Sequence, residues 1–279
     1  MINTLFVNGC SWTEGYLLQE EPQILEFANS IGYNITNIRE ATKNGLPVSF
    51  PIYEVYNQYN WAGIIAKELN IQNIVNYAEG GGSNHRIVRT TIDYVRGLTP
   101  EQKAETLVVI GWSLADRSEL YLDDKQTNAQ WTLFNASQEF ATLTPDGVFE
   151  KSFVERMSKF WECYVVDVHT SYASIFNFFQ QSELLANFLE NQGIRYYFFN
   201  TFPVFWGSHD IETSKLVQLQ NLAIYYNTKY NVLPTTDTFS EFVGHDEELR
   251  LSDGHPNSTA YKLWAKHLLK DMQLKGMYE

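Results

Sequence analysis

The sequence contains few cysteines and few basic residues. It has two cysteines among 279 residues, Cys10 and Cys163, which argues against a disulfide framework and indicates a reducing compartment. The 20 Lys and Arg residues against 33 Asp and Glu residues give a formal net charge of −13. Because this charge would repel a phosphate backbone, we expect no nucleic-acid partner.

Long apolar runs are also absent. The sequence has no apolar stretch of about 18 residues, and no basic segment followed by an apolar one opens it. We therefore expect a cytoplasmic protein with no membrane partner. The six histidines are scattered without a Cys/His cluster, so we expect no metal. No motif indicates a cofactor, and no pattern indicates an oligomeric state.

Four short apolar runs alternate with segments of helical periodicity. The runs end in Gly-rich or polar loops, which is typical of buried parallel strands, and they cover residues 4–8, 73–77, 106–110 and 195–199. Helical spacing appears at 61–69, at 87–95 and over 153–189, as one broken helix or two. The alternation predicts an α/β fold, a mostly parallel sheet with helices on both faces and ligands bound outside the carboxyl ends of the strands.

The chain is long enough to bury roughly three quarters of its unfolded surface, so we expect residues 1–279 to form a single domain. Two segments do not fit the alternating pattern and are predicted insertions. The segment at about 16–60 is too long for an ordinary connection, and we expect it to be partly irregular and to lie beside the site. The segment at about 117–150 carries turn signals and predicts turns or a hairpin.

A serine follows the first predicted strand, in Gly9-Cys10-Ser11. A sharp turn there can expose the Ser11 hydroxyl and direct backbone N–H groups at a developing oxyanion. The alternative is that Ser11 is the N-cap of the next helix. The motif differs from the elbow of α/β hydrolases because position 13 is Thr rather than Gly, and it lacks the Gly-Lys-Ser/Thr of a P-loop.

An aspartate and a histidine lie near the other end, in Asp253-Gly254-His255-Pro256. The proline restricts the backbone of His255, so this histidine is placed on a rigid turn. A serine nucleophile needs an imidazole to accept its proton, and the imidazole needs a partner that fixes its tautomer. Ser11, His255 and Asp253 are therefore candidate catalytic residues, and a capping turn or one arm of a metal site is the alternative for the second motif.

Three consecutive glycines, Gly80 to Gly82, follow the second predicted strand. Without side chains, their amides can approach a ligand closely, and one of them could complete an oxyanion hole. A flexible turn capped by Ser83 or Asn84 is an equal alternative.

Taken together and in this order, the three motifs resemble the SGNH/GDSL hydrolase superfamily. The resemblance identifies Ser11 with the nucleophile of the first block, Gly81 with the oxyanion amide of the second, and Asp253 and His255 with the last block. It implies a flavodoxin-like three-layer α/β/α sandwich. It also implies hydrolysis of carboxylic esters, including acetylated sugars, lipids and acyl thioesters.

The sequence departs from the pattern of that superfamily in three places. Ser113 stands where the third block has an Asn that donates to the oxyanion, so the oxyanion hole would comprise the amides of Ser11 and Gly81 with Ser113 or Asn84. Cys10 replaces the usual Asp. The third departure is that Asp253 precedes His255 by two residues where three is commoner.

We therefore expect a serine esterase that acts on a small-molecule or carbohydrate ester, with an O-acetyl or other short acyl group on a sugar preferred. A catalytically weakened SGNH domain that serves as a binding or structural module is one alternative, favoured by the change from Asn to Ser. An acyltransferase is another, because the same triad would serve it. The stretches 9–12 and 112–117 also resemble a branch of the superfamily found in bacteriophage genomes.

Overall fold

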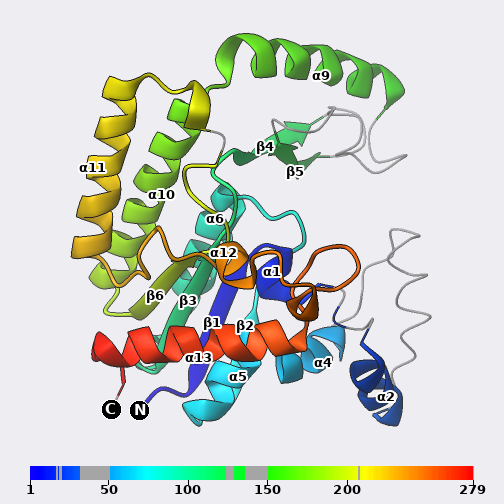
Figure 1. Ribbon diagram of the computed structural model, residues 1–279, viewed down its shortest axis with the longest axis vertical. Coiled ribbons are helices and arrows are strands. Elements are labelled where there is room, and N and C mark those ends of the chain that lie inside the picture. Colours follow the sequence, from blue (N-terminus) through cyan, green and yellow to red (C-terminus); the bar gives the residue numbers. More distant parts are fainter. Residues whose placement is uncertain are drawn as a thin grey trace.

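A parallel four-stranded sheet forms the centre of the computed structural model (Figure 1), which describes residues 1–16, 18, 21–31, 51–123, 129–135, 150–206 and 208–278. The strand order is β2-β1-β3-β6, and all three neighbouring pairs are parallel. The strands are β1 (Thr4–Gly9), β2 (Asn73–Asn76), β3 (Thr106–Trp112) and β6 (Arg195–Asn200). All four strands predicted from the sequence are thus present, with ends shifted by at most two residues.

Side chains that alternate along each strand enter two separate cores. Leu5 and Val7 of β1 belong to one apolar cluster, whereas Phe6 belongs to the other. Residues of β3 and β6 are divided in the same way, because successive side chains of a strand point to opposite faces. Burial on both faces explains why these strands are continuous apolar runs rather than alternating ones.

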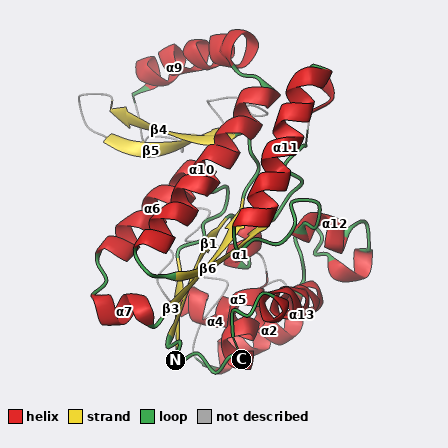
Figure 2. Ribbon diagram, turned by 90° about the vertical axis from the view of Figure 1, so that its left-hand side faces the viewer, coloured by secondary structure: helices red, strands yellow, loops and turns green. Residues whose placement is uncertain are grey.

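Helices cover both faces, which confirms the predicted three-layer α/β/α arrangement (Figure 2). One core is closed by α5 (Trp61–Glu68) and α13 (Ser258–Leu274). The other is closed by α6 (Asn84–Arg96), α10 (Ser171–Asn191) and α11 (Thr213–Lys229). Within the described ranges, no helix combines the length and the apolar character needed to cross a bilayer.

The segment predicted as one broken helix or two contains three helical pieces. The helix α9 (Lys151–Cys163) continues directly into the π-helix η2 (Tyr164–Val168), and α10 begins after a break at His169 and Thr170. The shorter helices are α1 (Ser11–Glu14), α2 (Pro22–Ser30), α4 (Pro51–Tyr59), α7 (Pro100–Ala104), α12 (Phe239–Val243), η3 (Ser208–Asp210) and η4 (Glu247–Leu249).

Both predicted insertions are described in part. The first contains α2 and α4, whose buried residues Ile24, Ala28, Val55 and Tyr56 join the core beside α5, and positions 32–50 lie outside the described residues. The second contains β4 (Arg117–Asp123) and β5 (Ala129–Asn135), which pair antiparallel as expected of a hairpin, and positions 124–128 and 136–149 lie outside the described residues. These two strands lie beyond the carboxyl ends of the sheet, with α9 next to them (Figure 1).

Candidate active site

The predicted site residues gather at the carboxyl edge of the sheet. Ser11 follows β1, the triple glycine follows β2, and Ser113 follows β3, and β1 lies between the other two strands. Gly9 and Gly111 are paired in register, so Ser11 and Ser113 leave adjacent strands at the same level. A Cβ on Gly80 would lie 4.0 Å from Ser11 Cβ. Ser11 is therefore flanked by the glycine turn on one side and by the end of β3 on the other.

Ser11 is the first residue of α1 rather than its N-cap, because Cys10 occupies the cap position. The capping interpretation of Ser11 is therefore wrong. Close packing of the preceding turn requires glycine, since a Cβ on Gly9 would lie 2.2 Å from Thr13 Oγ1 and 2.7 Å from the carbonyl oxygen of Gly111. Within the described residues, the backbone N–H of Ser11 makes no hydrogen bond, so it is available to a ligand.

His255 connects the two ends of the sequence. Its Nε2 lies 2.9 Å from Ser11 Oγ, and its Nδ1 lies 2.7 Å from Asp253 Oδ2. The other oxygen of Asp253 accepts the backbone N–H of His255 at 3.0 Å. The two-residue spacing therefore lets one carboxylate hold both the ring and the backbone of this histidine. With Nδ1–H donated to Asp253, Nε2 is left as the acceptor for the Ser11 proton.

The turn that carries His255 is fixed by local geometry. Gly254 has φ +90°, which favours glycine, and its N–H donates to the carbonyl of Leu251. The N-cap of α13 is Asn257, so His255 itself does not cap this helix. Within the described residues, no group of three or more His, Cys, Asp or Glu side chains could hold a metal ion. The turn thus does supply the cap of α13, through Asn257, while His255 itself is directed at Ser11.

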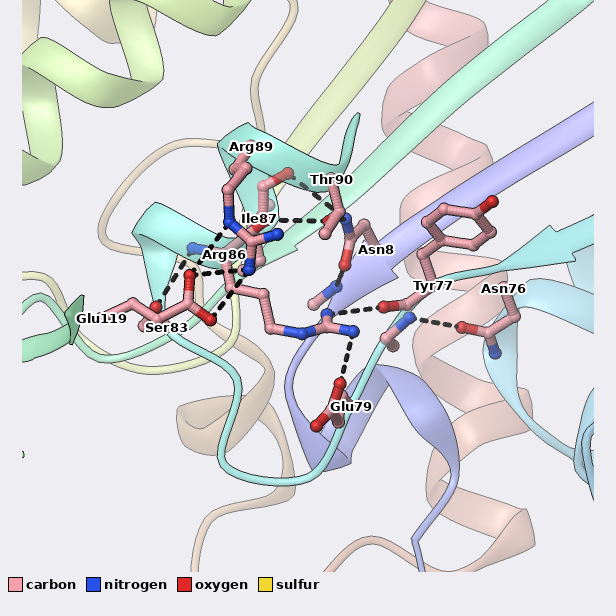
Figure 3. A network of polar contacts seen from close by, with 12 residues as sticks. Asn8, Asn76, Tyr77, Glu79, Ser83, Arg86, Ile87, Arg89, Thr90 and Glu119 are labelled. Atoms are coloured by element: carbon pink, nitrogen blue, oxygen red, sulfur yellow. Dashed lines mark hydrogen bonds and ion pairs between the residues drawn. The ribbon is translucent and has the colours of Figure 1, made fainter. Parts of the chain in front are cut away.

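The triple glycine forms a tight turn that other residues hold in place. The N–H of Gly82 donates to the carbonyl of Glu79 at 2.8 Å, and Gly81 at the third position has φ +76°. Arg86 donates to the carbonyl of Tyr77 at 2.8 Å and pairs with Glu79 (Figure 3). The N–H of Gly81 has no partner among the described residues. This amide is thus available beside Ser11.

Asn8, a residue that the sequence did not single out, fixes the end of β1. Its side chain is fully buried and donates to Thr90 Oγ1 at 2.8 Å (Figure 3). It also donates to Thr91 Oγ1 at 3.1 Å and accepts the N–H of Gly9. These bonds tie α6 to the strand that delivers Ser11. The feature of the sequence that could have revealed this role is a polar residue, Asn8, at the end of an otherwise apolar run.

Asn84 and Ser113, the two candidate third donors, are in direct contact. The Asn84 amide donates to the carbonyls of Ser113 and Leu114 at 3.3 and 3.1 Å, and its oxygen accepts the N–H of Ser113 at 2.9 Å. Both amide protons are therefore already used. The Ser113 hydroxyl accepts a hydrogen bond from Arg117 Nη1 at 3.1 Å, which leaves its own proton free to be donated. These contacts favour Ser113 over Asn84 as an oxyanion donor.

Cys10, which replaces the usual Asp of the superfamily, is fully buried in the core next to α13. The nearby Tyr261 is also fully buried, and desolvation raises the pKa of its hydroxyl well above 10.0, assisted by the nearby Cys10 and Glu14. Cys10 thus contributes to the packing of the apolar core rather than to the polar site.

Comparisons with known proteins place the chain in one family. The model of a family of unknown function, DUF6071, matches residues 47–271. That range includes Gly81, Ser113, Asp253 and His255 but not Ser11. Among curated proteins, none matches the chain.

Several solved structures resemble the chain at low identity. They include TesA, with 14% identity, TM-score 0.43 and coverage of 97% of this chain and 96% of the other. The psychrotrophic esterase EstA from Pseudoalteromonas sp. has 12% identity and a TM-score of 0.43, with coverage of 99% of this chain and 98% of the other. The lipase Lip_vut3 from a goat rumen metagenome has 12% identity and a TM-score of 0.46, with coverage of 97% of both chains.

Proposed function

We propose that the chain, which belongs to the DUF6071 family, is a serine esterase with Ser11 as nucleophile, His255 as general base and Asp253 as the residue that orients the base. The observation that carries this proposal is the chain of contacts from Asp253 through His255 to Ser11, at 2.7 and 2.9 Å. These are the distances that activation of a serine by an oriented imidazole requires.

The reaction proceeds in two halves. In the first, His255 Nε2 accepts the Ser11 proton while Ser11 Oγ attacks the carbonyl carbon of the ester. Collapse of the tetrahedral intermediate breaks the bond to the alcohol, which leaves with the proton from His255. In the second half, His255 deprotonates a water molecule that attacks the acyl-enzyme, and the acid departs as Ser11 regains its proton.

Three donors would stabilise the negative oxygen of each intermediate. They are the backbone N–H groups of Ser11 and Gly81, which are available on adjacent loops, and the hydroxyl of Ser113. Such donors are effective because they are oriented before the charge develops. The Arg117 hydrogen bond to Ser113 Oγ leaves the hydroxyl proton free to be donated elsewhere, which supports the choice of Ser113 as the third donor.

The substrate class that we propose is a short acyl ester, preferably an O-acetyl group on a carbohydrate. The test is hydrolysis of p-nitrophenyl acetate and of a peracetylated sugar by the wild-type and Ser11→Ala proteins. Acid released only by the wild type supports the proposal. The absence of turnover with every ester tested would favour a binding or structural module, and transfer of acetyl to an added alcohol in place of acid release would identify an acyltransferase.

A further inference from the structure

A polar cavity lies next to residues that contact Ser113. It has a volume of about 220 Å³ and lies between the connection from β3 to β4, the start of α6 and the segment from η2 to α10. Asn84 and Arg117 both line it, and both contact Ser113. A group bound there would therefore lie against two of the residues that hold Ser113, the proposed third oxyanion donor.

The charge of this cavity is opposite to that of the whole chain. Its lining contains the cation of Arg117 and no Asp or Glu, in a protein with a net charge of −13. His85 also lines it, and burial lowers the pKa of this histidine, which favours the neutral imidazole. The nearest acidic residues in the sequence, Asp116 and Glu119, do not line it, and Glu119 is paired with Arg89 on another face.

Arg117 provides an uncompensated positive charge. Among the described residues, no carboxylate pairs with it, and its Nε is buried without a hydrogen-bond partner. A guanidinium that retains unused N–H groups in a partly enclosed site is suited to bind a carboxylate or another planar anion.

The opposite wall supplies neutral hydrogen-bonding groups. His169 Nε2 lies 3.0 Å from Ser174 Oγ, and the amides of Asn177 and Gln181 follow along the same face of α10. At about 30 Å³ for each water molecule in the liquid, the cavity has the room of roughly seven waters. This is room for one compact polar unit rather than for a long acyl chain.

We propose that this cavity binds the carboxylate-bearing part of the substrate, a uronic acid unit of the carbohydrate that carries the ester, with Arg117 as its anion-binding residue. The proposal rests on the proposed esterase function, because the acyl group of the same molecule would lie at Ser11. It assigns to an acidic protein a substrate of the same charge sign, which requires a local positive site of this kind.

The test is a binding measurement that does not depend on catalysis. Glucuronate and glucose are titrated calorimetrically into the full-length Ser11→Ala protein, which cannot turn over an ester. The expected result is binding of glucuronate at least tenfold tighter than that of glucose. Equal binding of the two sugars, or binding of neither, would overturn the proposal even if the wild-type protein hydrolyses esters.

Two further substitutions in the same background identify the residue responsible. Arg117→Ala should weaken glucuronate binding at least tenfold, and Arg117→Lys, which keeps the charge but loses the fork of donors, should have an intermediate effect. Arg195→Ala is the matched control, since it changes the net charge equally at the start of β6, the opposite edge of the sheet. An equal loss in the Arg195 and Arg117 variants would overturn the assignment.

If the Arg117→Ala protein does not fold, the Arg117→Lys protein tests whether Arg117 binds the anion. Glucuronate binding unchanged from the Ser11→Ala parent would then count against Arg117. If glucuronate binds as expected but the wild-type protein hydrolyses no ester, the cavity is retained and the proposed function fails, so the two failures are distinguishable.

Discussion

Replacement of Asn84 and of Ser113 by alanine should produce two different defects. Asn84→Ala removes three hydrogen bonds, two of them buried, and leaves the N–H and carbonyl of Ser113 and the carbonyl of Leu114 without these partners. At about 1 kcal/mol net for each bond, the loss of unfolding free energy is about 3 kcal/mol. In a chain of this size, that loss lowers Tm by roughly 5–10 °C.

Ser113→Ala removes one hydroxyl, which accepts a single hydrogen bond from Arg117. Its effect on Tm should therefore be small. If the hydroxyl donates to the oxyanion, kcat falls about a hundredfold or more, equivalent to roughly 3–4 kcal/mol, with little change in KM.

The assay measures Tm by differential scanning calorimetry and kcat on p-nitrophenyl acetate, normalised to the fraction of molecules that a fluorophosphonate can label. This normalisation separates loss of folded protein from loss of turnover. An Asn84→Ala protein with wild-type Tm and a hundredfold lower kcat would refute the reasoning, and so would a Ser113→Ala protein with unchanged kcat.

The remaining predictions concern the triad, the glycine turn and a buried tyrosine. Ser11→Ala and His255→Ala should each abolish most esterase activity, and the double variant should be almost as active as either single variant, because the two residues act as a unit. Wild-type turnover by purified Ser11→Ala protein would exclude the mechanism. Asp253→Asn should reduce kcat less than either change, with KM unaltered, as steady-state kinetics can show. Gly81→Ala places a Cβ at φ +76° and should cost roughly 1–2 kcal/mol of stability and lower kcat, whereas unchanged kinetics would exclude its amide. Burial raises the pKa of Tyr261 in the folded state, so the contribution of this tyrosine to the free energy of unfolding is present below pH 10.0 and is lost as the pH rises above that value. The Tm measured by calorimetry should therefore decline above pH 10, and less steeply in Tyr261→Phe, whereas identical slopes in the two proteins would contradict this.

The sheet could be predicted because three of its four strands, β1, β3 and β6, are buried on both faces. Continuous apolar runs such as 106–110 have no other stable position in a chain of alternating strands and helices, and the loops after them define the edge where ligands bind. The contact between Ser11 and His255 was predictable in the same way, because both motifs combine a candidate catalytic side chain with residues that fix a turn.

The polar contacts that hold the site could not be predicted. Asn8 lies in an apolar run and Asn84 begins a helix, and neither position reveals a partner that is about 30 to 80 residues away in the sequence. The roles of these side chains depend on the packing of α6 against β1 and β3, which sequence periodicity does not specify. The same reason applies to the cavity at Arg117, since its walls come from three separated segments.

The most direct test of the central claim is labelling of Ser11 by a fluorophosphonate, followed by peptide mass spectrometry. Only a serine activated by a neighbouring base reacts at a useful rate. The account predicts that the wild-type protein is modified at Ser11 with a stoichiometry near one, and that His255→Ala is modified far more slowly. An unlabelled Ser11 in folded wild-type protein, or equal labelling rates in the two proteins, would contradict it.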